Sequence, residues 1–326
     1  MARQRAGARS VQTFAERFDA VVDNIAQVIQ GKDEAIRLAL TCLVAEGHLL
    51  IEDVPGVGKT SLAKALAASI DCRWHRIQFT PDLLPSDVTG VTVWNRGTGT
   101  FEFRPGGVFA NIVLGDEINR ASPKTQSALL EAMEERQVTV DAVTYPLDPP
   151  FMVIATQNPI EHEGTYPLPE SQLDRFLMRI RMGYPARRAE VAILDTHGGT
   201  LDALDELEPV SSAADVQAMV HVSHAVHVAA SLKGYIVDVA EATRRHPDLA
   251  LGMSPRAALG LQRAARARAA SVGRDYVVPD DLKDLAFTVL EHRLALTPEA
   301  QMRGVDRADV LGSALSSVRV PTGRAG

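Results

Sequence analysis

The chain has 326 residues, with 34 lysines and arginines against 41 aspartates and glutamates, so its formal net charge is −7. Hydrophobic residues make up 46% of the chain and charged residues 23%, which fits a globular protein and excludes wholesale disorder. The length predicts two domains. The acidic balance argues against non-specific nucleic-acid binding, which needs a basic face.

The sequence offers no clear signal for membrane insertion, secretion or a disulfide scaffold. No uncharged apolar run is long enough to span a membrane, and no apolar stretch follows Arg3, Arg5 and Arg9, so we expect neither a membrane segment nor a secretory signal. Cys42 and Cys72 are too few for a disulfide scaffold and are typical of buried thiols in a reducing compartment. We therefore expect a cytoplasmic protein in which residues 1–13 form a disordered basic tail.

Short apolar runs alternate with helical patterns over residues 14–185. The runs lie at 48–51, 74–79, 112–114, 151–156 and 178–182, with helical patterns at 61–70 and 124–135. This alternation predicts an α/β domain, a parallel sheet with helices on its faces.

The amino-acid composition changes after Gly183-Tyr184-Pro185, because Ala, Leu, Arg and Glu dominate the rest of the chain. We expect a linker and a first helix over 186–212, including a connecting loop at 198–212, and then a helical domain over 213–326. Four helical patterns support that domain, at 215–230, 233–244, 255–272 and 279–292.

A glycine-rich turn lies between the first apolar run and a helical pattern. It reads Asp53-Val54-Pro55-Gly56-Val57-Gly58-Lys59-Thr60 and is followed by Ser61. Strand, turn and helix in this order predict a phosphate-binding loop, in which Lys59 reaches the β- and γ-phosphates and the Thr60 hydroxyl binds Mg²⁺. Asp53 stands where the general pattern has glycine. The alternative is a Gly-Pro turn that happens to precede a lysine.

Two successive acids, Asp116 and Glu117, follow the apolar run at 112–114. Ligands of open parallel sheets bind at the carboxyl ends of the strands, where these acids are expected. We expect Asp116 to hold Mg²⁺ through water and Glu117 to orient and deprotonate an attacking water, which favours hydrolysis over transfer. The alternative is an acidic start to the helix that begins near Ser122.

Asn158 follows a third strand, where its amide is expected to bind the γ-phosphate or the attacking water, unless it only forms an Asn-Pro turn. Arg175 is the candidate for an arginine finger that reaches the γ-phosphate of a neighbouring subunit. Arg179 and Arg120 compete for that role, and an ion pair with Asp174 or Glu170 is the structural alternative.

Arg256 is expected in the first turn of a helix in the second domain. Ser254 suits the N-cap of that helix and Pro255 its first position. From there Arg256 is a candidate to contact the γ-phosphate and to couple this domain to the nucleotide. The alternative is an exposed surface arginine.

Taken together, these motifs resemble the MoxR family of AAA+ ATPases. The resemblance begins near Phe14 and also rests on the runs at 103–111, 116–120, 126–135, 155–159, 173–176 and 254–256. It implies a AAA+ P-loop NTPase fold, an αβα sandwich on a five-stranded parallel sheet followed by a small helical lid. It further implies rings, typically hexamers, with ATP at the subunit interfaces.

The resemblance also assigns site residues. Lys59 and Thr60 match Walker A, Asp116 and Glu117 Walker B, Asn158 sensor 1, Arg175 the arginine finger, Arg256 sensor 2, and Ile29 and Gly31 the segment near adenine. Two insertions resemble family inserts. Residues 85–105 match the helix-2 insert with two short strands, and 137–149 match the hairpin before sensor 1. The alternative for both insertions is an ordinary surface hairpin. Trp94 and Phe101 are candidates for gripping a client, or they are core residues.

The leading hypothesis is a ring-forming ATPase that remodels or helps assemble protein complexes. The resemblance implies a MoxR-type chaperone that acts on a protein client together with a von Willebrand A-domain protein. One alternative is a nucleic-acid motor or helicase subunit of the same clade, against which the charge of −7 argues. Another is a nucleotide-gated scaffold with little turnover.

Overall fold

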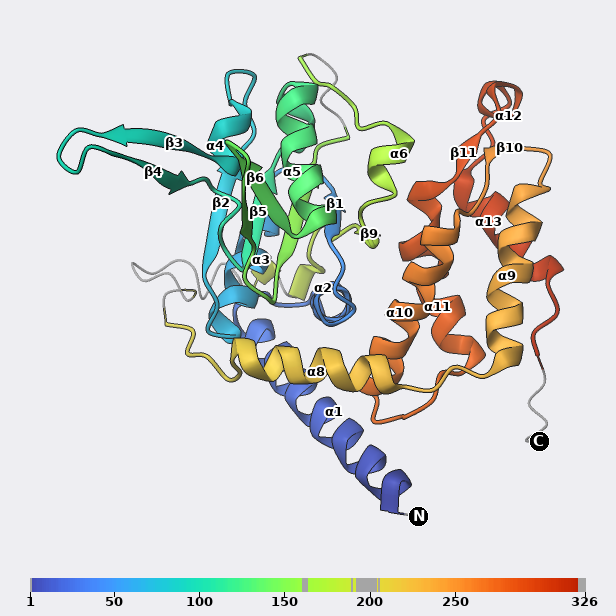
Figure 1. The fold of residues 1–326 in the computed structure, drawn as a ribbon. Coiled ribbons are helices and arrows are strands. Elements are labelled where there is room, and N and C mark those ends of the chain that lie inside the picture. The colour runs from blue at the N-terminus through green and yellow to red at the C-terminus, as the bar shows by residue number, and fades with distance from the viewer. Residues whose placement is uncertain (1, 160–163, 189, 192–203, 205, 322–326) are drawn as a thin grey trace. The chain divides into compact units, whose positions relative to one another are not determined.

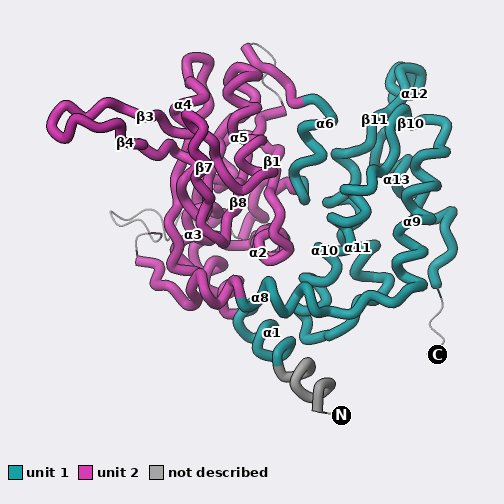
Figure 2. Tube along the Cα trace, in the orientation of Figure 1, with its two compact units in different colours: residues 1–19, 169–179, 218–326 teal, residues 20–168, 180–217 magenta. Residues whose placement is uncertain are grey.

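The structure is a computed structural model that describes residues 2–159, 164–188, 190–191, 204 and 206–321 (Figure 1). The chain divides into two compact units. Unit 1 combines residues 1–19, 169–179 and 218–326, and unit 2 combines residues 20–168 and 180–217 (Figure 2). Each unit is therefore built from separate segments of the chain, whereas the sequence pattern places a single boundary near residue 185.

A five-stranded parallel sheet with the strand order β2-β5-β8-β1-β9 is the centre of the α/β part. Its strands are β1 (Leu49–Glu52), β2 (Trp74–Gln78), β5 (Ile112–Asp116), β8 (Met152–Gln157) and β9 (Met178–Ile180). All five predicted strands are confirmed. The central strands β5 and β8 are buried along almost their whole length, as expected for a parallel sheet covered on both faces.

The register of the sheet brings the strand ends together. Gln78 at the end of β2 pairs with Asp116 at the end of β5, and Glu52 at the end of β1 pairs with Gln157 at the end of β8. Polar residues that are far apart in the sequence therefore meet at one edge of the sheet, where the site is built.

Helices α2 (Asp33–Val44), α3 (Lys59–Ser69), α4 (Pro85–Thr89) and α5 (Pro123–Glu135) accompany the sheet, together with the short 3-10 turn η1 (Ile118–Arg120). The predicted helices at 61–70 and 124–135 correspond to α3 and α5. Ser122 caps α5, because its side chain accepts a hydrogen bond from the Thr125 amide, and Pro123 occupies the first helical position.

Helix α1 (Ala2–Val28) runs through the segment expected to be a disordered tail. Val11, Phe14, Phe18, Val21 and Ile25 are buried and recur at helical spacing. Burial of this apolar stripe provides the stabilisation that an isolated tail lacks.

Two hairpins interrupt the α/β pattern, as the sequence predicts. The first pairs β3 (Gly90–Asn95) with β4 (Thr100–Pro105) and projects away from the sheet (Figure 1). The second pairs β6 (Gln137–Val140) with β7 (Val143–Pro146), and its Tyr145 stacks on Phe103 of the first hairpin at 3.9 Å. Trp94 and Phe101 pack edge to face at 4.9 Å but are 49% and 71% exposed, so they are not core residues.

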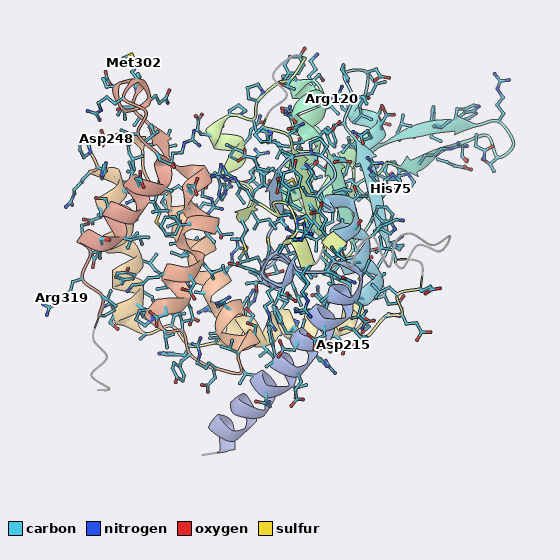
Figure 3. The ribbon with its side chains drawn as sticks, turned by 180° about the vertical axis from the view of Figure 1, so that it is seen from behind. His75, Arg120, Asp215, Asp248, Met302 and Arg319 are labelled. Atoms are coloured by element: carbon cyan, nitrogen blue, oxygen red, sulfur yellow. The ribbon has the colours of Figure 1, made fainter. Side chains whose placement is uncertain are left out.

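The helical part contains α8 (Ala213–Ala225), α9 (Ala230–Arg244), α10 (Pro255–Ser271) and α11 (Pro279–Leu290), which confirm the four predicted helices with shifted ends. Smaller elements complete it: α6 (Glu170–Leu173), β10 (Leu249–Leu251), η2 (Glu291–Arg293), β11 (Ala295–Leu296), α12 (Pro298–Met302) and α13 (Arg307–Ser317). The first helix expected within 186–212 lies largely outside the described residues. Asp248 pairs with Arg303 near the exposed Met302 (Figure 3).

In the described part of the chain, no helix is long and apolar enough to cross a membrane. Cys42 is buried and Cys72 is half-buried. Burial and the neighbouring Asp71 raise the pKa of the Cys72 thiol to about 11, so it stays protonated at neutral pH.

His292 of η2 is completely buried, and its Nε2 lies 3.1 Å from the carbonyl oxygen of Phe176. Burial and the nearby Arg293 charge lower the pKa of His292 well below its ordinary value. The imidazole is therefore neutral, and the proton on Nε2 is the one that it donates to Phe176.

This buried histidine predicts a loss of stability in acid. In the unfolded chain His292 binds a proton below about pH 6.5, whereas the folded protein keeps it neutral, so falling pH favours unfolding by at most about 1.4 kcal/mol per pH unit. In His292→Gln, which keeps a donor for Phe176, we expect the free energy of unfolding to decrease less between pH 7 and pH 5 than in the wild type. Urea unfolding at both pH values measures this free energy. Equal decreases in the two proteins would contradict a neutral, buried His292.

Candidate nucleotide-binding and hydrolysis site

The turn after β1 has the backbone of a phosphate-binding loop. Gly56 and Gly58 have positive φ angles of 83° and 91°, a conformation that costs glycine little and other residues more. Helix α3 begins at Lys59 immediately after Gly58, so its N-terminal N–H groups and its positive dipole end face the loop. The loop is therefore shaped to bind an anion.

Asp53, the departure from the general loop pattern, has a structural explanation. Its carboxylate accepts hydrogen bonds from the amides of Val54 at 2.8 Å and Gly183 at 2.5 Å, and its carbonyl oxygen accepts one from Lys59 Nζ at 2.7 Å. Glycine at this position could not tie the loop to Gly183. Lys32 holds the same segment, because its Nζ donates to the carbonyls of Met182, Gly183 and Tyr184 at 2.6–2.8 Å.

A cavity of about 430 Å³ opens above the loop. Its lining brings together the loop, both acids and the predicted amide: Pro55, Gly56, Gly58, Lys59, Thr60, Ser61, Arg76, Asp116, Glu117 and Asn158. A second hollow of about 230 Å³ shares Gly56, Gly58 and Ser61 with the first and is otherwise lined by Val28, Ile29, Gln30, Lys32, Val57 and Pro185. Gly31 lies in the turn before α2 with a φ of 71° and is not among the residues that line either hollow.

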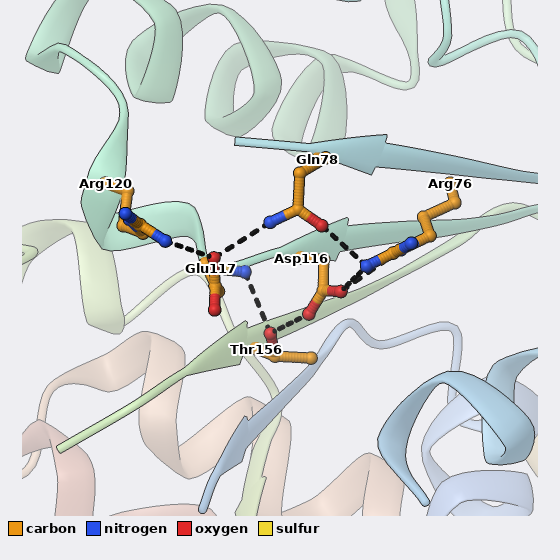
Figure 4. A network of polar contacts seen from close by, with 6 residues as sticks. All are labelled: Arg76, Gln78, Asp116, Glu117, Arg120 and Thr156. Carbon is orange, nitrogen blue, oxygen red and sulfur yellow. Dashed lines mark hydrogen bonds and ion pairs between the residues drawn. The ribbon is translucent and has the colours of Figure 1, made fainter. Parts of the chain in front are cut away.

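Thr156, at 0% exposure, joins the ends of β5 and β8. Its hydroxyl donates to Asp116 Oδ1 at 2.6 Å and accepts from the Glu117 amide at 2.9 Å (Figure 4). Arg76 approaches the other oxygen of Asp116, with Nη2 at 2.6 Å and Nε at 3.1 Å. Both oxygens of the Asp116 carboxylate therefore have a donor within the protein.

The backbone of Glu117 is left-handed, with a φ of 56°, which is uncommon for a residue other than glycine. Two side chains hold its carboxylate, because Oε2 accepts from Gln78 Nε2 at 2.9 Å and from Arg120 Nη1 at 3.0 Å (Figure 4). Gln78 also accepts from Arg76 Nη2 at 2.6 Å, so the contacts of the two acids form one network. The network fixes the direction in which Glu117 meets the cavity.

Sequence reasoning missed four members of this site, namely Lys32, Arg76, Gln78 and Thr156. Three of them lie on strands that were correctly predicted. Thr156 precedes the loop that carries Asn158, and Arg76 and Gln78 lie two residues apart on β2, so both point to the same face. A search of every strand end for polar residues on one face would have found these three, but no local pattern identifies Lys32.

The four candidate arginines lie in different surroundings. Arg120 pairs with Glu117 beside the cavity, and Arg179 pairs with Glu291 at 2.5 Å. Arg175 lies half-buried in the turn after α6, within unit 1. Arg256 is exposed in the first turn of α10, also in unit 1. The described contacts thus engage Arg120 and Arg179 within their own units.

Asp116 and Thr60 offer the hard oxygen donors that Mg²⁺ prefers, and both line the same cavity. Two such donors fit an ion that is shared with a nucleotide, as Mg²⁺ is in phosphoryl-transfer sites.

The parallel sheet, the phosphate-binding loop, the two acids and the helical part define an ATPase of the AAA+ class. Comparison with family models agrees. Residues 48–178 match the model described as ATPase family associated with various cellular activities (AAA), and residues 241–313 match the AAA lid domain.

Comparison with known relatives identifies the family within the AAA+ class. The chain is 51% identical to the uncharacterized protein YeaC of Bacillus subtilis, over 93% of this chain and 94% of that one. It is 40% identical to Chaperone MoxR1 of Mycobacterium tuberculosis, over 97% of this chain and 85% of that one. A crystal structure of a Cytophaga hutchinsonii protein, provisionally described as an ATPase, superposes with a TM-score of 0.91 at 37% identity, covering 99% of this chain and all of that one.

The chain belongs to the MoxR family of AAA+ ATPases. It therefore binds nucleotide and hydrolyses ATP to ADP and phosphate. The predicted fold, the α/β domain with a helical lid, is confirmed.

The network predicts the effect of removing one hydroxyl. Thr156→Val keeps the shape of the side chain but leaves the Glu117 amide unsatisfied, which should lower the free energy of unfolding by about 1–3 kcal/mol. Because Glu117 loses its fixed geometry, we expect turnover to fall by about tenfold or more while nucleotide still binds. Thr156→Ser keeps the hydroxyl and should resemble the wild type. Normal turnover in the valine variant would contradict this account.

Proposed function

We propose that this chain forms a ring, hexameric by family resemblance, in which ATP hydrolysis remodels or helps assemble protein complexes. The observation that carries the proposal is the single cavity that collects the phosphate-binding loop, the acid pair and Asn158. That set is suited to hydrolysis, so it favours an ATP-driven machine over a scaffold with little turnover. The relative MoxR1 is named a chaperone, which supports the same role here.

In this proposal each residue of the cavity has a distinct task. Lys59 and the loop amides bind the β- and γ-phosphates, and Thr60 and Asp116 hold Mg²⁺, which neutralises charge on those phosphates. Glu117 takes a proton from the attacking water, and Asn158 orients that water or the γ-phosphate. Ile29 and the turn at Gly31 accommodate the adenine end, since Ile29 lines the adjoining hollow.

Two arginines complete the proposed site from unit 1. Arg256, in the first turn of α10, contacts the γ-phosphate of its own subunit. Arg175 contacts the γ-phosphate of the next subunit in the ring. An arginine that reaches the transferring phosphoryl group accelerates such reactions by about 10³–10⁵-fold. The match of Arg175 to the arginine finger of the family supports it as the residue that acts between subunits.

Client contact is assigned to the hairpin of β3 and β4. Its Trp94 and Phe101 form an exposed aromatic pair, and large exposed aromatics are typical of protein-binding surfaces.

A von Willebrand A-domain protein is the proposed partner, by family resemblance. We place the protein in the cytoplasm, where Cys42 and Cys72 would stay reduced.

Complementation between two inactive variants tests the arrangement of the sites. Glu117→Gln should bind ATP without turnover, and Arg175→Ala should lose most of its turnover. Mixed assemblies should regain activity, roughly tenfold above either variant alone, because an intact Arg175 then meets an intact Glu117 of the neighbour. Mixing Arg175→Ala with the double variant Glu117→Gln/Arg175→Ala is the control. Full activity of Arg175→Ala on its own would refute action between subunits.

A second experiment tests the protein-remodelling role. Tagged Glu117→Gln, loaded with ATP, should retain client proteins in a pulldown, and Trp94→Ser/Phe101→Ser in the same background should lose them without losing ATP. Surface changes of this kind cost about 0.5 kcal/mol or less, so folding should survive. Met302→Ser, which removes an even more exposed apolar side chain from unit 1, is the matched control. Turnover stimulated by DNA in a salt-dependent manner would instead favour a nucleic-acid motor.

A further inference from the structure

The turn that carries Arg175 is held by side chains of the helical part of unit 1. The carbonyl oxygen of Phe176 accepts from Arg293 Nη2 at 2.7 Å and lies 3.1 Å from His292 Nε2. A few residues further on, Arg179 pairs with Glu291 at 2.5 Å. Three consecutive residues of η2 therefore hold the segment on the C-terminal side of Arg175, two through the Phe176 carbonyl and one through the Arg179 side chain.

Asp174, immediately before Arg175, has a separate attachment. Its carboxylate accepts a hydrogen bond from Ser254 Oγ, which lies 3.2 Å from Oδ2 and 3.3 Å from Oδ1. Arg293 Nε lies 3.2 Å from Oδ1, and the Arg293 side chain is only 4% exposed. A guanidinium that is buried to this extent needs a counter-charge, and Asp174 supplies it.

The hydroxyl of Ser254 has two roles. It caps α10 by accepting from the Ala257 amide at 3.0 Å, and it donates its own proton to Asp174. Arg256 lies two residues after Ser254, in the helical turn that this cap fixes. One hydrogen-bonded contact therefore links the turn of Arg256 to the residue before Arg175.

Close packing reinforces this contact. A Cβ atom built on Gly260 of α10 would lie 3.0 Å from Leu177 Cδ1 and 3.1 Å from Arg293 Nη1. Glycine thus allows α10 to approach both the turn of Arg175 and the arginine that holds it. The first turns of α10 and the turn of Arg175 are packed as one body, so a displacement of one is transmitted to the other.

We propose that Asp174 is a positioning residue that couples two neighbouring nucleotide sites of the ring through its contact with Ser254. The inference rests on the proposed roles of Arg256 at its own subunit's ATP and of Arg175 at the next subunit's ATP. When Arg256 contacts a γ-phosphate, the first turn of α10 fixes the position of Ser254. Ser254 in turn positions Asp174, and Asp174 positions Arg175. The nucleotide state of one subunit thereby controls hydrolysis in the next, and such coupling is reciprocal for binding.

Mixed assemblies of two variants isolate this coupling. Reporter subunits carry Arg175→Ala and keep Glu117, so they hydrolyse ATP only with help from a neighbour. Donor subunits carry Glu117→Gln and keep Arg175, so they give help but hydrolyse nothing themselves. Turnover of the mixture then measures how well the donor's Arg175 acts on the reporter's site.

The decisive donor also carries Ser254→Asp. Aspartate is a good N-cap, so α10 keeps its cap, but its carboxylate cannot donate to Asp174 and repels it. We expect reporter turnover to fall by about fivefold or more. The reporter's KM for ATP should stay unchanged, because its own nucleotide contacts are intact. Arg256→Ala in the donor should give the same loss, although the donor's own site is already inactive.

Ser254→Thr is the matched control, because threonine keeps both the cap and the hydroxyl donor, and it should leave reporter turnover unchanged. A Ser254→Asp donor that activates the reporter as well as the simple Glu117→Gln donor does would overturn the coupling. If Ser254→Asp does not fold, Ser254→Gly in the donor decides in the same way, since glycine is tolerated at an N-cap and removes the hydroxyl that donates to Asp174.

A further donor separates this inference from the function on which it rests. If Glu117→Gln/Arg175→Ala donors activate the reporter as well as Glu117→Gln donors, the action of Arg175 between subunits is wrong, and the coupling falls with it. If activation requires Arg175 but is insensitive to Ser254→Asp, only the coupling is wrong.

Discussion

The Thr156 hydroxyl joins the ends of two adjacent strands by donating to the Asp116 carboxylate and accepting from the Glu117 amide. Successive residues of a strand normally point to opposite faces, so two adjacent acids cannot both face one cavity on regular β backbone. The strand therefore ends at Asp116, and Glu117 adopts a left-handed conformation that Thr156 stabilises. The rest of the hydrolytic site depends on this contact.

Cations balance the two carboxylates from opposite sides. Arg76 approaches Asp116, Arg120 approaches Glu117, and Gln78 connects the two contacts (Figure 4). Arg76 donates to the carboxylate that is proposed to hold Mg²⁺, so a metal ion bound there would compete with the guanidinium for the same oxygen.

In unit 1, a carboxylate and a cation likewise balance each other at Asp174. One carboxylate balances the buried Arg293 and accepts a hydrogen bond from the cap of α10. The two arginines proposed to act on ATP therefore belong to one packed body, although the sequence separates them by about 80 residues. Interactions of this kind, with a buried charge at their centre, lose most when one partner is removed.

Much of this organisation was predictable from the sequence. Buried parallel strands leave clear apolar runs, so the sheet was predicted correctly, and the loop and Asn158, which the sequence singled out separately, line one cavity. The network around the acids was not predicted, because Arg76 and Gln78 reach Asp116 and Glu117 only through the register of β2 with β5. Helix α1 was not predicted over residues 1–13, because arginines dominate that segment and the apolar stripe begins only at Val11.

An electron cryomicroscopy structure of Glu117→Gln assembled with ATP and Mg²⁺ would show the hydrolytic site and its neighbouring subunit together. The account predicts Asp116 and Thr60 beside the metal, Arg76 displaced from the Asp116 oxygen that it now contacts, and Arg175 of the neighbouring subunit at the γ-phosphate. A structure in which Arg76 still pairs with Asp116, or in which no Arg175 approaches a γ-phosphate across a subunit interface, would contradict it.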